Sequence, residues 1–130
     1  MEGFPFVHRE PVRFGDLDAM GHVNNALYLT YIESARIAFL LDLGLVRGLD
    51  ELAIVVARIE IDFRSPVRIG EAVEIGVRTG GFGRKSFELE YRLEVDSRLV
   101  ADARSVCASY DYARREATTI PDTWRERLVA

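Results

Sequence analysis

Residues 25 to 44 have the sequence NALYLTYIESARIAFLLDLG, and this stretch decides the fold. Its residue types favour helix, no glycine or proline interrupts it, and Gly44 stands where helices commonly stop. Apolar side chains occupy more than one stripe along this helix. A helix that is apolar nearly all round is enclosed by other structure. The stretch therefore predicts one long helix over residues 25–43, buried within the rest of the chain.

Around this helix the sequence predicts β-strands. Apolar residues alternate with charged or polar ones, which is the period of a strand with one face in the core. The predicted strands are residues 6–14, 55–63, 73–78, 87–96 and 99–112. Pro11 marks the first as an edge or bulged strand, and Gly80-Gly-Phe-Gly83 predicts a turn. A short helix with a proline near its start is expected over residues 120–127.

The order of these elements is a strand, the long helix, and then four strands joined by short turns. Consecutive strands with tight connections pair mainly antiparallel. We therefore expect a single α+β domain, in which a curved, mainly antiparallel five-stranded sheet wraps around one long buried helix and a short C-terminal helix follows. In a chain of 130 residues a ligand pocket competes with the core, so we expect a second subunit to cover part of the surface.

The composition narrows the classes of function. The net charge of −4 argues against nucleic acid as a partner, because an acidic surface repels phosphate backbones. Cys107 is the only cysteine, which excludes an internal disulfide and a multi-cysteine metal site. The N-terminal residues lack the pattern of a signal peptide, and no apolar run reaches the ~20 residues of a membrane span. We therefore expect a cytoplasmic protein that enters no membrane and binds no metal.

The segment before the helix, Phe14-Gly-Asp-Leu-Asp-Ala-Met-Gly-His-Val-Asn-Asn25, is polar although it must lie close to the core. Asp16 and Asn24 have an ordinary explanation, since aspartate closes turns and asparagine caps helices. Asp18 is different, because it stands just before a helix whose first N–H groups lack partners and carry partial positive charge. Such groups polarise a carbonyl placed against them while the carboxylate lies beside it. For a thioester this combination is sufficient, because a thiolate leaves without a strong general acid.

The segment Phe14-Gly-Asp-Leu-Asp-Ala-Met-Gly21 resembles the motif of the 4-hydroxybenzoyl-CoA thioesterase family of the hotdog superfamily, and the resemblance covers nearly the whole chain. It implies one hotdog thioesterase domain over residues 1–130 that hydrolyses acyl-CoA and needs no cofactor. The second aspartate of the motif is catalytic in the family, which implies this role for Asp18. The family polarises the thioester carbonyl with a backbone N–H at the start of the long helix, and the matching position is Asn25.

A second part of the resemblance concerns CoA. The family's basic stretch that contacts the CoA phosphates is similar to Gly83-Arg-Lys-Ser-Phe87, which implies substrate binding by Arg84, Lys85 and Ser86. Gly83 departs from the family pattern. A solvated turn is the other interpretation of these residues. Arg64, just before Ser65-Pro66, is a further candidate for phosphate binding. We expect the protein to form at least a homodimer, and a homotetramer is a second possibility.

His22 belongs to a second resemblance. The run His22-Val-Asn-Asn25 is similar to acyl carrier protein thioesterases, in which an Asp-x-Asn-x-His pattern precedes Val-Asn-Asn. Asp18 and His22 keep that spacing, but Met20 replaces the asparagine. His22 is therefore either an orienting or substrate-side group, or a structural histidine satisfied by the backbone.

Glu33 lies on the buried helix, where a carboxylate is expensive unless it is paired. An ion pair with Arg36, three residues further on, is one explanation. The other is a polar group in the substrate pocket, since Glu33 is about two turns from Asn25.

Several functions remain open at this stage. Asp18 acts either as the nucleophile or as a general base on water, and the carrier of the acyl group is either CoA or acyl carrier protein.

A hotdog hydratase would need a histidine five residues after the first aspartate, whereas His22 comes one residue too late after Asp16. A non-catalytic hotdog domain that binds acyl groups or CoA is the third class. The sequence does not identify the acyl group.

Overall fold

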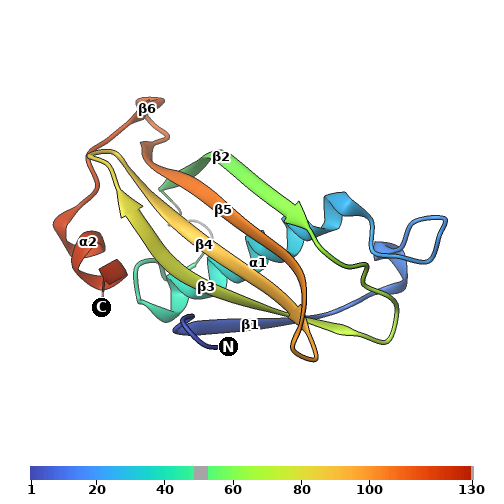
Figure 1. Ribbon diagram of the computed structural model, residues 1–130. Helices are drawn as coiled ribbons and strands as arrows, with labels where there is room; N and C mark the ends of the chain where they lie inside the picture. The colour runs from blue at the N-terminus through green and yellow to red at the C-terminus, as the bar shows by residue number, and fades with distance from the viewer. Residues whose placement is uncertain (49–52, 130) are drawn as a thin grey trace.

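A computed structural model describes residues 1–48 and 53–129 of the chain. One long helix, α1, lies against a curved sheet, and a short helix, α2, follows near the C-terminus (Figure 1). Within the described ranges, neither helix is long and apolar enough to cross a membrane.

Helix α1 runs from Asn25 to Asp42, as the sequence predicts. It begins where the side chain of Asn24 accepts a hydrogen bond from the N–H of Ala26 at 3.0 Å, which satisfies one of the free donors of the first turn. It ends before Gly44, whose φ of +70° lies in the left-handed region that glycine adopts without strain.

The sheet has five long strands in the order β1-β3-β4-β5-β2, and all neighbouring pairs are antiparallel. The strands are β1 Phe6–Pro11, β2 Ile54–Phe63, β3 Ala72–Phe82, β4 Ser86–Val95 and β5 Arg98–Asp111. A two-residue strand, β6 Glu116–Ala117, pairs with the end of β5. The predicted α+β class and antiparallel sheet are confirmed. Strands β1 and β2 form the two edges.

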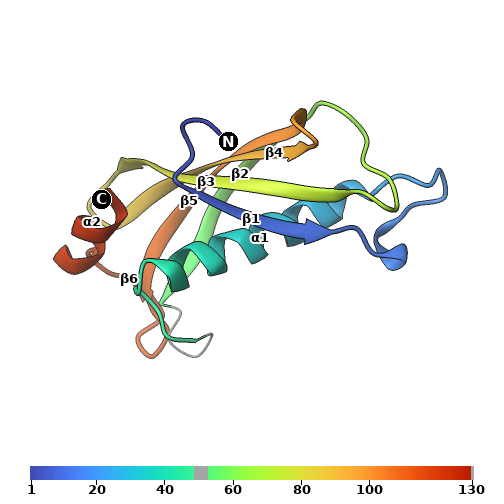
Figure 2. The ribbon, with the colours of Figure 1, turned by 90° about the horizontal axis from the view of Figure 1, so that it is seen from below.

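One side of α1 packs against a face of the sheet (Figure 2). Tyr31, Ile32 and Leu40 of the helix are fully buried there, under an apolar face built from alternate residues of β3, β4 and β5. The other side of the helix is open, and Leu29 and Leu41 are each 42% exposed. The sheet therefore encloses the helix on one side only, and the described residues 1–48 and 53–129 leave the apolar side chains on the other side partly exposed.

The ends of several elements differ from the prediction. Gly80 and Gly81 lie inside β3, where the pairing with β4 shifts register between Thr79 and Phe82, so these glycines accompany a bulge and the turn comes after them. The first strand stops at Pro11, earlier than expected, because the chain then bends into the polar segment. The C-terminal helix α2 spans Asp122–Val129.

Candidate active site

The polar segment between β1 and α1 folds as a small closed loop. It starts with a 3-10 turn at Phe14–Asp16, and a backbone bridge then pairs Leu17 with Val23. Between these two residues the chain reverses, and Gly21 makes this possible with a φ of +79°. The loop therefore holds Asp18 at the base of a tight turn.

Asp18 is fixed through one carboxylate oxygen. Its Oδ1 accepts hydrogen bonds from the backbone N–H of Met20 at 2.9 Å and of His22 at 3.2 Å. Its own N–H donates to the carbonyl oxygen of His22 at 2.8 Å. The described residues provide no hydrogen bond to Oδ2. One oxygen therefore fixes the side chain, while the other remains available to react.

The start of α1 presents a free donor. The N–H of Ala26 donates to the Asn24 side chain, and the N–H of Leu27 donates to the Asn24 carbonyl at 2.8 Å. For the N–H of Asn25, the described part of the chain offers no acceptor. This donor carries the partial positive charge of a helix N-terminus, which suits a developing oxyanion.

Asp18 and Asn25 line the same cavity, which has a volume of about 440 Å³. Predicted site residues His22 and Arg64 also line it, together with Tyr28 and other residues from the start of α1 and the end of β2. The lining residues are Asp18, Met20, His22, Val23, Asn24, Asn25, Tyr28, Phe63, Arg64, Ser65 and Pro66. A carboxylate and an unsatisfied N–H thus share one cavity, which is what the cleavage of an activated carbonyl requires.

Arg64 and His22 have different surroundings within this cavity. Arg64 donates to both carboxylate oxygens of Asp102, at 3.0 and 3.4 Å, and lies 3.6 Å from Asp62. The hydrogen bond and charge of Asp102 raise the pKa of Arg64, and these carboxylates compete with any phosphate for the guanidinium. His22 is tied to Asp18 through its backbone, while no hydrogen bond of its imidazole is found among the described residues.

Asp16 has a partner that the sequence did not indicate. Its Oδ2 accepts a hydrogen bond from the hydroxyl of Tyr31 at 2.6 Å, inside the protein. Burial raises the pKa of the Asp16 carboxyl, but hydrogen bonds from Tyr31 and Arg13 and the charge of Arg13 outweigh this effect, so the pKa lies below its ordinary value. Tyr31 is fifteen residues away in sequence, and only the packing of α1 brings it close.

Glu33 lies outside this cavity. It lines another one, of about 350 Å³, between α1 and the start of β2, with Ile37 and Val55 among its walls. The hypothesis of an ion pair between Glu33 and Arg36 is wrong, since the structure contains no such pair. Arg36 is buried and donates instead to the hydroxyl of Tyr91 in the core, at 3.3 Å.

Arg84, Lys85 and Ser86 lie at the opposite end of the sheet from Asp18. They follow β3, whose first residue pairs with the last residue of β1 beside the polar loop. Strand β3 has 11 residues, which at roughly 3.3 Å each extends about 35 Å. Figure 1 shows the β3–β4 turn and the loop before α1 at the two ends of the molecule. A single chain therefore does not bring the basic stretch to Asp18.

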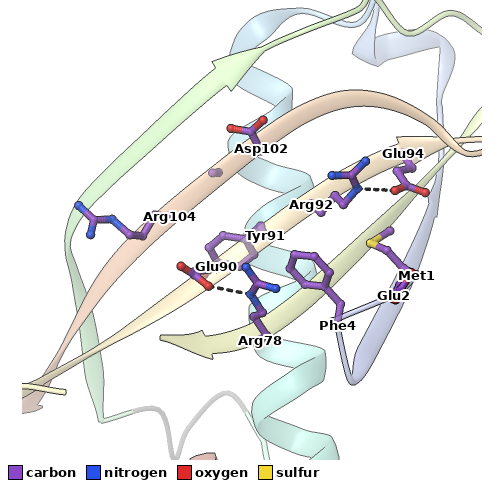
Figure 3. A pocket seen from close by; sticks show the side chains of 11 residues that line it. Met1, Glu2, Phe4, Arg78, Glu90, Tyr91, Arg92, Glu94, Asp102 and Arg104 are labelled. Atoms are coloured by element: carbon purple, nitrogen blue, oxygen red, sulfur yellow. Dashed lines mark hydrogen bonds and ion pairs between the residues drawn. The ribbon is translucent and has the colours of Figure 1, made fainter. Parts of the chain in front are cut away.

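A larger cavity, of about 620 Å³, lies on the outer face of the sheet (Figure 3). Met1 and Phe4 fold over Gly76 at its edge, where a side chain on Gly76 would collide with them. Two ion pairs lie within its lining, Arg78 with Glu90 at 2.7 Å and Arg92 with Glu94. Its lining does not include the start of a helix, whose free N–H the smaller cavity provides, so we take the smaller cavity as the candidate active site.

Comparison with known proteins identifies the family. A family described as the thioesterase-like superfamily matches residues 12–128. A 1,4-dihydroxy-2-naphthoyl-CoA hydrolase of Synechococcus elongatus is 32% identical over 124 residues, covering 90% of each chain. The long-chain acyl-CoA thioesterase FadM of Escherichia coli is 31% identical over 121 residues, covering 90% of this chain and 92% of the relative.

The fold is shared with solved thioesterases. A thioesterase from Thermus thermophilus, solved in complex with coenzyme A and zinc, superimposes with a TM-score of 0.90 at 39% identity and covers 98% of this chain and 94% of that one. The family match and the structural match therefore both extend over almost the whole described chain. The chain belongs to the thioesterase-like superfamily, and it is a thioester hydrolase with the hotdog fold.

Proposed function

We propose that the protein hydrolyses acyl-CoA thioesters to the free acid and CoA, with Asp18 as the reacting carboxylate and the Asn25 N–H as the oxyanion donor. The observation that carries this proposal is the shared cavity, in which Asp18 keeps one free oxygen and Asn25 keeps a free N–H. CoA as the carrier is supported by the related thioesterase that was solved with coenzyme A.

In the nucleophilic route, Oδ2 of Asp18 attacks the thioester carbon, and the carbonyl oxygen develops negative charge against the Asn25 N–H. The carbon–sulfur bond then breaks and CoA leaves as a thiolate that takes a proton from solvent. Water hydrolyses the resulting mixed anhydride and restores the carboxylate. In the general-base route, Asp18 instead removes a proton from a water molecule that attacks the thioester directly.

The test is an acyl-CoA panel with a thiol-detecting reagent, run on the native protein, Asp18→Asn and Asp42→Asn. Asp42 is an exposed carboxylate at the far end of α1 and serves as the matched control. We expect Asp18→Asn to lose several powers of ten in kcat and Asp42→Asn to keep native turnover. Near-normal turnover by Asp18→Asn would rule out both routes. An acyl adduct on Asp18 in rapidly quenched single turnovers separates the nucleophile from the base.

We also propose that the site is completed by a second copy. Strand β2 is a ten-residue edge of the sheet, and such an edge pairs readily with another strand. A two-fold dimer that joins two β2 strands antiparallel places the Phe63 end of one against the Ile54 end of the other. The Phe63 end borders the cavity of Asp18.

The Ile54 end is where the basic stretch lies. Ile54 pairs with Ser109, and the N–H of Ser109 donates to the carbonyl of Lys85 at 2.9 Å. The β2–β2 dimer therefore moves Arg84, Lys85 and Ser86 of a second copy toward Asp18, where they would bind the CoA phosphates. It also moves the cavity lined by Glu33 toward the same place, so that Glu33 would contribute a polar wall for the acyl group.

A further inference from the structure

Asp16 makes an unusual set of contacts for a residue in a surface loop. Its side chain is buried, with only 6% of the residue exposed. Its Oδ2 accepts from the hydroxyl of Tyr31 at 2.6 Å and from the N–H of Arg13 at 3.1 Å, and the Arg13 guanidinium lies 3.6 Å away. A buried carboxylate needs such partners, and here the strongest of them comes from the second turn of α1.

The backbone of the same residue makes a second contact with the helix. The carbonyl oxygen of Asp16 accepts the N–H of Asn24, the capping residue of α1, at 2.9 Å. Asp16 is therefore attached to α1 at two points, at the cap through its backbone and at Tyr31 through its side chain. Two points fix the orientation of this part of the loop against the helix, whereas one would leave it free to rotate.

The reacting groups lie on either side of this attachment. Asp18 follows Asp16 by two residues, and Asn25 follows Asn24 directly. The distance from the Asp18 carboxylate to the Asn25 N–H therefore depends on how the loop is held against the helix. We propose that Asp16 and Tyr31 are positioning residues that set this distance, an inference that rests on the proposed roles of Asp18 and Asn25.

The core provides a matched comparison. Ser105 is fully buried, and its hydroxyl shares a hydrogen bond of 2.7 Å with the hydroxyl of Tyr91. Ser105→Ala removes one buried hydroxyl, as Tyr31→Phe does, but Ser105 lies on β5 within the sheet, and its hydroxyl has Tyr91 and Cys107 as hydrogen-bond partners. A purely structural role for Tyr31 predicts the same effects for both variants.

The experiment compares Tyr31→Phe, Asp16→Ala and Ser105→Ala by two independent measurements. The first is kcat and KM for an acyl-CoA that the native protein cleaves. A misplacement of about 1 Å in a reacting pair costs about 10²-fold in rate, so we expect a fall of that order in kcat for Tyr31→Phe, a larger one for Asp16→Ala, and little change in KM. Ser105→Ala should keep kcat within about twofold, since it leaves the reacting pair in place.

The second measurement is amide hydrogen exchange, which needs no activity. We expect faster exchange at the N–H groups of Met20, His22 and Asn24 in Tyr31→Phe, and native exchange there in Ser105→Ala. Native loop exchange in Tyr31→Phe, or a loss of kcat equal to that of Ser105→Ala, would overturn the proposal. If the native protein cleaves no thioester, the proposed function fails, and the exchange data alone still decide whether Asp16 and Tyr31 hold the loop.

Discussion

Asp16 and Asp18 are two residues apart and have different surroundings. Asp16 is buried, and its Oδ2 is held by Tyr31 and Arg13, whereas Asp18 lines a cavity, and its Oδ1 is held by the backbone N–H groups of its own loop. Neighbouring carboxylates can divide their roles in this way, because environment and not residue type sets what each one does. In our proposals, one carboxylate holds the loop and the other reacts with the thioester.

The burial and pairing of Asp16 predict how stability depends on pH. The pKa of Asp16 is lowered in the folded protein, so its contribution to stability is present above the unfolded pKa of about 3.9 and is lost as the pH falls through the folded value. Asp16→Asn cannot lose this contribution on acidification. We therefore expect the free energy of unfolding, measured in urea at pH 7 and near pH 3.5, to fall more for the native protein than for Asp16→Asn. An equal fall in both would contradict this assignment.

At the scale of elements, the start of α1 serves both the fold and the site. Asn24 satisfies the N–H of Ala26 with its side chain and that of Leu27 with its carbonyl, which leaves the N–H of Asn25 exposed to the cavity. In the proposed function this N–H binds the substrate carbonyl, while the first turn of the helix keeps its own hydrogen bonds.

Asn25→Pro tests this donor directly. Proline is well tolerated at the first position of a helix and has no N–H, and the preceding residue Asn24, with φ −59° and ψ 135°, already has a conformation that proline permits. We expect kcat to fall about 10²- to 10³-fold, the usual effect of removing one oxyanion donor, with helix content by circular dichroism unchanged. Asn25→Ala keeps the N–H and should remain within a few-fold of native. Equal losses in both variants would assign the role to the Asn25 side chain.

At the scale of the whole molecule, the proposed site is divided between the two ends of the sheet. Asp18 and Asn25 lie at one end of the sheet and the basic stretch lies at the other, so a single copy does not unite them. The proposed second copy would also cover the open side of α1, where Leu29 and Leu41 are partly exposed.

Mixing variants tests this division. One chain carries Asp18→Asn, and the other carries Arg84→Ala with Lys85→Ala, and each alone should be impaired. In a mixed dimer one of the two sites receives a native Asp18 and a native basic stretch, so random mixing should restore about a quarter of native activity. The measurement is thioester cleavage after the two chains are unfolded and refolded together. Activity no higher than the mean of the two variants would place both groups in one chain or exclude the basic stretch from the site.

The elements and the proximity of the polar segment to the start of α1 were predictable from the sequence because their causes are local. Alternation with a period of two marks the strands, an uninterrupted run of helix-forming residues ending at Gly44 marks α1, and the capping of that helix by Asn24 follows from a short side chain at its start. The motif around Asp18 adjoins the helix in sequence, so its proximity to Asn25 also needed no knowledge of the fold.

Contacts between distant segments were decided only by the tertiary structure. The hydrogen bond from Tyr31 to Asp16 depends on how α1 packs against the loop, and the bond from Arg36 to Tyr91 joins residues 55 apart in sequence. The spacing of Glu33 and Arg36 along one helix favoured an ion pair between them. That spacing does not show which side of the helix is buried, because the sheet determines this. For the same reason the sequence determined which residues we propose for the site, Asp18 and Arg84 among them, whereas the length and direction of β3 determined that these two lie at opposite ends of the molecule.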